Sequence, residues 1–115
     1  MKYSQKNIKK LIAALEEFQK VDPRISLPSM LAFLYYHDIE GRSGNRSTVE
    51  ERLGMTGATA SRATLYWQDY KEPKVRGKNM LERVDDPEDR RFQVVTYNRD
   101  GIELLQRLDK AIGDE

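Results

Sequence analysis

The sequence predicts a mainly α-helical fold with a small β-hairpin, in the α+β class. Near both ends of the chain, apolar residues recur at spacings of three and four, which places them on one face of a helix. Residues 92–96 instead alternate in polarity, which is the period of a half-buried strand, and they follow a charged turn that contains a proline. At 115 residues, the chain is long enough to form one core, so we expect a single domain over residues 1–115.

The composition excludes several kinds of site. The chain contains no cysteine and one histidine, which excludes disulfides and thiolate chemistry and argues against a histidine-ligated metal site. No apolar run approaches the roughly 20 residues that span a bilayer, so we expect a soluble cytoplasmic protein without a membrane partner. The net charge of +1, with 34% charged residues, indicates a mixed surface and not the strongly basic surface of non-specific nucleic-acid binders.

An N-terminal helix is predicted within residues 1–25, over about residues 4–20. It ends before Pro23, because the residue that precedes a proline is pushed out of helical geometry. The apolar stripe of this helix fits two roles equally well, packing on the core of its own domain or contact with a second copy in a dimer. The stripe consists of Ile8, Leu11, Ile12, Leu15 and Phe18.

A second helix is predicted to begin at Ser26, with Pro28 in the first turn, where an unpaired backbone N–H is expected anyway. It is apolar on most sides from Met30 to Tyr36, so we expect it to be the central helix of the core. Residues 41–45 are small and polar, which predicts a loop.

Residues 47–70 predict two short helices joined by a tight turn. Ser47 and Glu50 have the spacing of a capping box, in which each side chain satisfies a free backbone N–H of the first helical turn. Gly54 can adopt the left-handed conformation that ends a helix and turns the chain. Met55 is expected to be a buried turn residue.

The second of these helices is predicted to begin after Thr56, as its cap, and to run to about residue 69. Its first two turns carry mostly small residues, which let a helix enter the major groove, together with hydroxyls and an arginine that can meet base edges and phosphates. The single tryptophan is expected in the core and not at a nucleic-acid surface. The exposed set is Gly57, Ala58, Thr59, Ser61 and Arg62, and the opposite face comprises Ala60, Ala63, Thr64 and Trp67.

Residues 70–79 carry a proline, a glycine and four basic residues, and they are predicted to form a polar connection. Residues 80–97 then predict a β-hairpin, with Phe92 on the buried face of the second strand and the following residues alternating. Residues 98–113 predict a C-terminal helix capped by Asn98. Its apolar stripe is Ile102, Leu105, Leu108 and Ile112, widened by Leu104.

This order of elements is that of a winged helix-turn-helix, which presents one helix and one hairpin tip on the same side of a small domain. The hairpin and last helix resemble those of MarR-type (multiple-antibiotic-resistance regulator) winged-helix repressors. The resemblance lies in Asp86-Pro87-Glu88-Asp89-Arg90-Arg91 and in Tyr97-Asn98-Arg99-Asp100-Gly101, where the family usually has Leu-Thr-x-x-Gly. Upstream, Leu53-Gly54-Met55-Thr56 and Thr59-Ala60-Ser61-Arg62 are similar to the family's turn and recognition helix.

The resemblance implies roles for individual residues of the hairpin, which is the wing. In the family, a wing aspartate pairs with the arginine two residues on, and that arginine enters the minor groove. By position these are Asp89 and Arg91, with Arg90 as a neighbour. A carboxylate that holds the arginine reduces the side-chain freedom lost on binding, and a narrow minor groove attracts cationic groups. Arg46 joins the candidate DNA-binding residues from segment 42–62, where four arginines stand against two glutamates.

The resemblance also implies a homodimer built from the N-terminal and C-terminal helices, and a small aromatic compound as an effector. We therefore predict a sequence-specific, double-stranded DNA-binding transcriptional regulator without cofactor or metal. The alternative is a winged-helix protein-interaction module, an accessory factor that recruits transcription or replication proteins, which the near-neutral charge favours. An enzyme is not expected, because the acidic residues of the wing are interleaved with arginines and the sequence indicates no cavity there.

Three features depart from the family. Glu50 stands where helix-turn-helix proteins usually have an alanine for close packing, so a different crossing of the two helices is expected. Residues 70–79 lengthen the link into the wing. Asn98 replaces a threonine but can cap a helix equally well.

Overall fold

The computed structural model describes residues 2–39, 44–72 and 75–113, and for residues 70–72 it describes the backbone alone. The protein is mainly helical with two antiparallel strand pairs, which confirms the predicted α+β class. The elements are α1 (Gln5–Val21), α2 (Leu27–Asp38), α3 (Asn45–Leu53), α4 (Gly57–Leu65), β1 (Tyr70–Glu72), β2 (Val75–Arg76), β3 (Leu81–Asp85), β4 (Gln93–Tyr97) and α5 (Arg99–Ile112).

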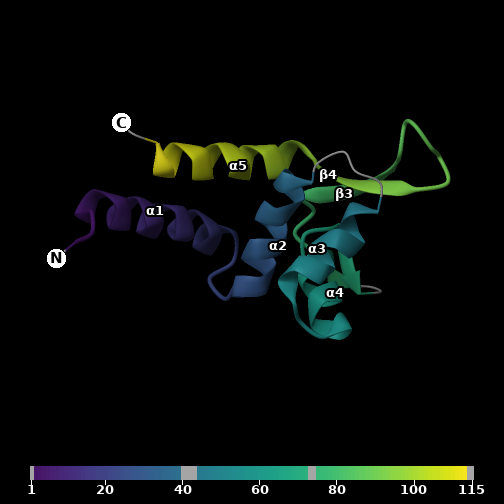
Figure 1. Ribbon diagram of the computed structural model, residues 1–115, viewed down its shortest axis with the longest axis horizontal. Helices are drawn as coiled ribbons and strands as arrows, with labels where there is room; N and C mark the ends of the chain where they lie inside the picture. The colour runs from purple at the N-terminus through teal and green to yellow at the C-terminus, as the bar shows by residue number, and fades with distance from the viewer. Residues whose placement is uncertain (1, 40–43, 73–74, 114–115) are drawn as a thin grey trace.

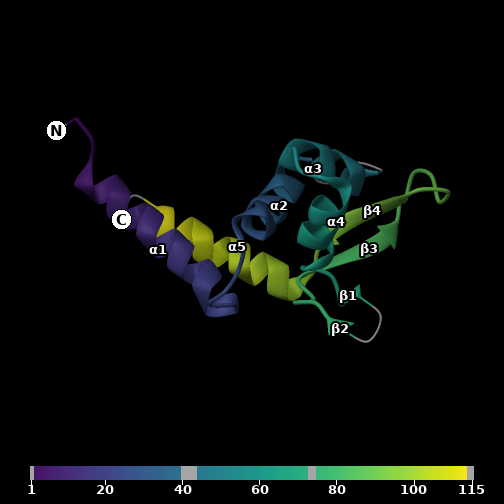
Figure 2. The same cartoon turned by 90° about the horizontal axis from the view of Figure 1, so that it is seen from below.

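The molecule is elongated, with extents of 52 × 30 × 26 Å, and it has two parts (Figure 1). Helices α1 and α5 lie side by side and antiparallel in an arm, so both chain termini lie at its far end (Figures 1 and 2). The other helices and the four strands form the body. None of the helices in the described ranges is long and apolar enough to cross a membrane.

Local capping sets the ends of three helices where the sequence predicts them. The Ser4 side chain accepts a hydrogen bond from the backbone N–H of Asn7 at the start of α1. The Ser26 side chain accepts from Ser29 at the start of α2. The Asn98 side chain accepts from the backbone N–H of Gly101 at the start of α5.

The start of α3 differs from the prediction. The helix begins at Asn45 after Gly44, whose φ of 67° is left-handed, so Ser47 lies inside the helix and the predicted capping box with Glu50 is wrong. The buried Asn45 amide donates to the carbonyl oxygen of Val95 and accepts from its N–H, both at 2.9 Å. This contact with β4 holds the first turn of α3 three residues earlier than a cap at Ser47 would.

Helix α4 ends at Leu65 and not near residue 69. The backbone carbonyls that follow it accept hydrogen bonds from residues 78–81 instead. The backbone N–H of Lys78 donates to Tyr66 at 2.8 Å, and those of Met80 and Leu81 donate to Trp67 at 2.8 and 2.9 Å. Carbonyls engaged in this way do not accept bonds from a continuing helix.

The core lies where α1 meets the body. Phe33 of α2 packs on Trp67, with ring centroids 4.6 Å apart, and on Tyr97, with centroids 5.1 Å apart. The Trp67 indole N–H donates to the carbonyl oxygen of Ser29 at 2.6 Å, and its ring is fully buried, which confirms its predicted place in the core. Met55, predicted to be buried, is exposed in the turn before α4.

Strands β3 and β4 pair from Leu81 with Tyr97 to Asp85 with Gln93, which confirms the predicted hairpin. The predicted alternation is wrong, because Phe92 is 51% exposed whereas Val94 and Val95 are 3% and 2% exposed. Strand β4 contacts both α3 and α5, so successive residues are covered on opposite faces.

Residues 70–79, predicted to be a polar connection, contain a second hairpin. Tyr70 of β1 is paired with Arg76 of β2, and Glu72 is paired with Val75. This hairpin follows α4, and β1 contacts that helix (Figure 2). Residues 73 and 74 between its strands are outside the described residues, as are residues 40–43, which include Arg42 and the first part of the loop predicted over residues 41–45.

Candidate nucleic-acid interface

The turn between α3 and α4 presents the predicted small face of α4. Gly54 ends α3 with a φ of 63°, a left-handed backbone conformation that residues with a Cβ atom rarely adopt. The Thr56 hydroxyl donates to the hydroxyl of Thr59 at 3.1 Å and makes no cap bond to the backbone. Thr56, Gly57, Ala58 and Arg62 are exposed, and Ala60, Ala63 and Thr64 are buried, as the spacing predicts. Thr59 and Ser61, predicted to be exposed, are half-buried.

A polar network joins α3 to α4, and it consists of Arg46, Glu50, Ser61 and Thr64. One Glu50 carboxylate oxygen accepts from Arg46 Nε at 3.1 Å and from the Thr64 hydroxyl at 3.0 Å. Arg46 Nη2 also donates to the Ser61 hydroxyl at 3.0 Å. A glutamate is therefore accommodated at the helix crossing because its carboxylate bonds both helices.

The polar network changes what two of the predicted DNA-binding residues can do. Arg46 and Ser61 are bonded to each other and to the rest of the network, so they position α4 against α3. The Arg46 side chain is still 29% exposed, which leaves part of the guanidinium at the surface. The sequence does not reveal this arrangement, since it depends on the distance between two helices.

The turn of the β3–β4 hairpin is built on Asp86. Its carboxylate accepts from the backbone N–H of Glu88 at 2.9 Å, and its own N–H donates to the carbonyl oxygen of Phe92 at 3.0 Å. The backbone N–H of Asp89 donates to the Asp86 carbonyl oxygen at 3.2 Å. Asp86 is buried, so this acidic residue shapes the turn and is not a free surface charge.

Asp89 and Arg91 form a two-point ion pair at the tip of this hairpin. Arg91 Nε and Nη2 donate to the two Asp89 carboxylate oxygens at 3.0 and 2.8 Å. The hydrogen bonds from Arg91 lower the pKa of the Asp89 carboxyl below its ordinary value. The Arg91 side chain is 83% exposed, and Arg90 beside it is also exposed. The predicted pairing of Asp89 with Arg91 is therefore confirmed.

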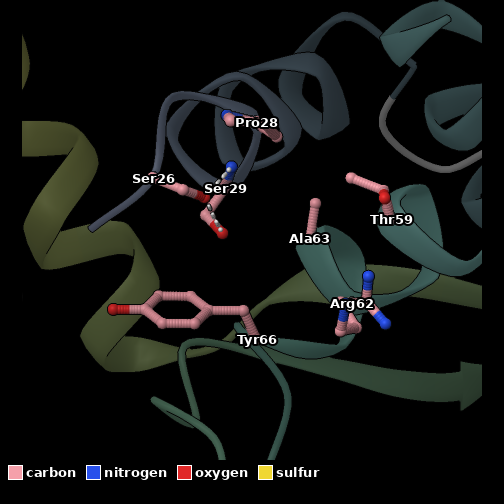
Figure 3. A pocket seen from close by; sticks show the side chains of 7 residues that line it. All are labelled: Ser26, Pro28, Ser29, Thr59, Arg62, Ala63 and Tyr66. Carbon is pink, nitrogen blue, oxygen red and sulfur yellow. Dashed lines mark hydrogen bonds between the residues drawn. The ribbon is translucent and has the colours of Figure 1, made fainter. Parts of the chain in front are cut away.

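Helix α4 and the β3–β4 hairpin belong to the body, in the half of the molecule away from the chain termini, and the hairpin projects from it (Figures 1 and 2). A hollow of about 280 Å³ separates α4 from the start of α2. Thr59 and Arg62 face Ser26 and Ser29 across it (Figure 3), and Tyr66 closes one side, where its hydroxyl donates to Asp22 at 2.7 Å. Burial raises the pKa of the Tyr66 hydroxyl above its ordinary value.

The acidic side chains in this part of the molecule bear on whether a metal ion could bind here. Within the described ranges, histidine, aspartate and glutamate side chains do not gather in groups of three that could hold a metal ion. Two acidic residues of the β3–β4 turn are engaged by other groups, since Asp86 accepts from a backbone N–H and Asp89 accepts from Arg91.

The comparisons with known proteins are negative. Neither the family models nor the curated proteins nor the solved structures that were compared with this chain include a match.

Proposed function

We propose that this protein is a winged helix-turn-helix regulator of transcription that binds specific sequences in double-stranded DNA. In this proposal, α4 is the recognition helix and lies in the major groove. The β3–β4 hairpin is the wing, and Arg91 at its tip enters the adjacent minor groove. The observation that carries the proposal is that a small-faced helix and a hairpin with an exposed, ion-paired arginine at its tip both belong to the body, away from the chain termini.

The first turns of α4 suit a groove because they are small and exposed. Gly57 and Ala58 add little bulk between the helix backbone and the bases, while the Thr59 hydroxyl and the Arg62 guanidinium can hydrogen-bond base edges or phosphates. The polar network behind this face holds α4 in place, which reduces the freedom that the helix loses on binding.

Arg91 suits the minor groove for a related reason. The guanidinium donates two hydrogen bonds to the Asp89 carboxylate, which hold it in place, yet most of its surface remains open to a partner. A cation fixed in this way meets the negative potential of a narrow minor groove at a smaller entropic cost than a free side chain.

The arm supports a dimer as the active form. Ile8, Leu11, Ile12 and Leu15 of α1 are 45 to 56% exposed, and among the described residues only Phe18 of the predicted stripe is buried. An apolar face of this size beside α5 fits a second copy, with a two-fold axis that pairs like with like. Two bodies related in this way would read half-sites roughly one helical turn apart.

The same proposal includes an effector site between the arm and the body. A groove of about 510 Å³ lies between α2 and α5, and Leu34, Ile102 and Leu105 line it together with His37. These side chains suit a small aromatic compound.

The alternative proposal is a winged-helix module that binds another protein and recruits it to transcription or replication. The net charge of +1 favours it, because most duplex-binding surfaces are more basic. Under this alternative, the exposed face of α4 contacts the partner protein in place of DNA.

Selection from a random duplex pool separates the two proposals. The protein is incubated with the pool at low salt, bound duplexes are recovered and amplified, and the enriched sequences are read. The regulator enriches a near-palindromic site. Recovery of random sequence alone, at protein concentrations in the micromolar range, favours the protein-interaction module.

Arg91→Ala tests the role of the wing on the selected site. We expect the binding free energy to weaken by at least ~1 kcal/mol, the low end for a lost charged hydrogen bond. Arg99→Ala is the matched control, since Arg99 is also exposed and paired with an acidic neighbour, Glu103. Equal affinities of the two variants at moderate salt would remove Arg91 from the interface.

A further inference from the structure

Phe92 lies in the turn of the wing and is about half exposed, although the sequence predicts that it is buried. Two backbone hydrogen bonds fix its place in the turn. Its N–H donates to the carbonyl oxygen of Asp89 at 3.0 Å, and its carbonyl oxygen accepts from the N–H of Asp86, also at 3.0 Å. The exposed ring is therefore attached to a hydrogen-bonded turn, on a hairpin that projects from the body (Figures 1 and 2).

A second apolar side chain lies on the same side of the hairpin. Side chains along a strand alternate between its two faces, so Phe92 shares a face with Val94. Val84 is paired with Val94 on the neighbouring strand and points to that face too. Val84 is also exposed. The outer end of the wing thus presents a small apolar surface, which the rest of the described chain does not cover.

The arginine at the tip of the wing lies beside the Phe92 ring. The guanidinium carbon of Arg91 is 5.7 Å from the ring centroid, within the range of a cation–π contact. The same guanidinium donates two hydrogen bonds to Asp89. A fixed cation beside an exposed ring matches the minor groove of DNA, where arginine meets a negative potential and apolar side chains insert between base steps.

The charge of the wing favours an apolar contact over a purely ionic one. Residues 82–91 contain three basic and five acidic residues, a net charge of −2. A hairpin of this charge is not attracted to phosphates by its overall field. An inserted ring gains free energy from the burial of its apolar surface, which does not depend on that field.

From these observations, we infer that Phe92 is a wedge that inserts between two base pairs from the minor groove and partly unstacks them, beside the point where Arg91 enters. The inference rests on the proposed function and adds a source of specificity to it. Pyrimidine–purine steps such as TA unstack more easily than the stiff A-tracts. The wing thus selects a deformable step without reading base edges, while α4 reads the bases in the major groove.

The test measures unstacking with aminopurine, a fluorescent adenine analogue whose emission rises when it leaves the base stack. The analogue replaces successive adenines of the selected duplex, one at a time. With the wild type, we expect the emission to rise at one step in each half-site, outside the positions that α4 reads. Phe92→Ala should abolish this rise and weaken binding at least about tenfold, the least expected when a buried phenylalanine ring is lost.

The salt dependence of binding distinguishes the ring from the arginine beside it. A ring releases no counterions, so the slope of log affinity against log salt should be the same for Phe92→Ala as for the wild type. A lower slope for Phe92→Ala would mean that the substitution acts by displacing Arg91, against the inference.

The wedge also predicts a change in the selected sequence. Selection with the wild type should enrich a pyrimidine–purine step at the unstacked position, and selection with Phe92→Ala should return a random step there. Enrichment of the same step by both proteins would assign its recognition to another part of the chain, which overturns the inference.

Two further variants serve as controls. Tyr3→Ala removes an exposed aromatic ring that precedes α1 in the arm, so it should bind and unstack the duplex as the wild type does. Phe92→Leu keeps an apolar side chain that can also act as a wedge, so it should retain most of the rise in emission. Because Phe92 is exposed, circular dichroism of both Phe92 variants should match that of the wild type.

The outcomes separate the inference from the function on which it rests. If the wild type binds the selected duplex without any rise in emission, or if Phe92→Ala gives the same rise, the inference is wrong and the proposed function stands. Equal losses with Phe92→Leu and Phe92→Ala, or with Tyr3→Ala and Phe92→Ala, also overturn the inference, because the effect is then not that of an apolar wedge in the wing. If the wild type enriches no site from the random pool, the proposed function fails first and the inference with it.

Discussion

The body of this protein buries its largest apolar side chains, whereas helix α1 of the arm leaves most of its apolar stripe exposed. In the body, Trp67, Phe33 and Leu81 are completely covered by neighbouring side chains. In the arm, four residues of α1 that repeat with helical spacing remain about half exposed. The sequence pattern is equally clear in both parts, so periodicity identifies a helical face without saying what covers it.

The arrangement of α1 explains the difference. The helix packs on α5 with another face, where Glu17 accepts from Arg107 at 3.1 Å and Ala13 lies near Ala111. Its apolar stripe meets the core only at Phe18, whose ring packs against Phe33 with centroids 6.0 Å apart. One residue of the stripe thus packs on the core, and we propose that the other four contact a second copy.

The largest effect on this comparison is expected from Trp67→Ala. The substitution removes the most extensive buried ring and its hydrogen bond to Ser29, so we expect a loss of about 3 to 5 kcal/mol in the free energy of unfolding. Urea denaturation followed by circular dichroism measures it. Phe92→Ala, at the exposed end of β4, is the control and should cost only about 0.5 kcal/mol. Similar losses for the two would mean that the core is not centred on Trp67.

A smaller effect, confined to assembly, is expected from Leu11→Gln/Leu15→Gln. Both side chains are exposed in the single chain, so the unfolding free energy of the monomer should change by only about 0.5 kcal/mol. The dissociation constant of the dimer should rise at least about tenfold, since burying each of these apolar side chains in the interface contributes about 1.5 to 3 kcal/mol. Sedimentation equilibrium reports the change. A wild type that is monomeric throughout the micromolar range would show that a second copy does not cover the arm.

Local signals in the sequence predicted the starts of α2 and α5 correctly, whereas the predicted side-chain caps at Ser47 and Thr56 are wrong. Ser26 and Asn98 bond backbone groups three residues away, so the information that sets those helix ends is contained in a few neighbouring residues. The hairpin over residues 80–97 and the pairing of Asp89 with Arg91 are local in the same sense.

The errors share a different cause, which is contact between distant parts of the chain. Asn45 sets the start of α3 because Val95 lies beside it, fifty residues away. Residues 78–81 bond the backbone carbonyls that follow α4, so the helix ends early, and a hairpin stands where a loose connection was expected. Glu50 departs from the usual alanine because Arg46 and Thr64 surround its carboxylate. No local pattern contains these distances.

The central claim, that the exposed start of α4 enters a DNA groove, is tested most directly by comparing duplex binding of Ala58→Glu with that of Gln5→Glu. Both substitutions place one carboxylate in the exposed first turn of a helix. A negative charge interacts favourably with the helix dipole there, so both proteins should fold as the wild type does. Fluorescence anisotropy with the selected duplex then measures affinity. We expect Ala58→Glu to weaken binding by at least about tenfold, because its charge faces phosphates, while Gln5→Glu binds as the wild type does. Equal affinities of the two variants would contradict the placement of α4 in the groove.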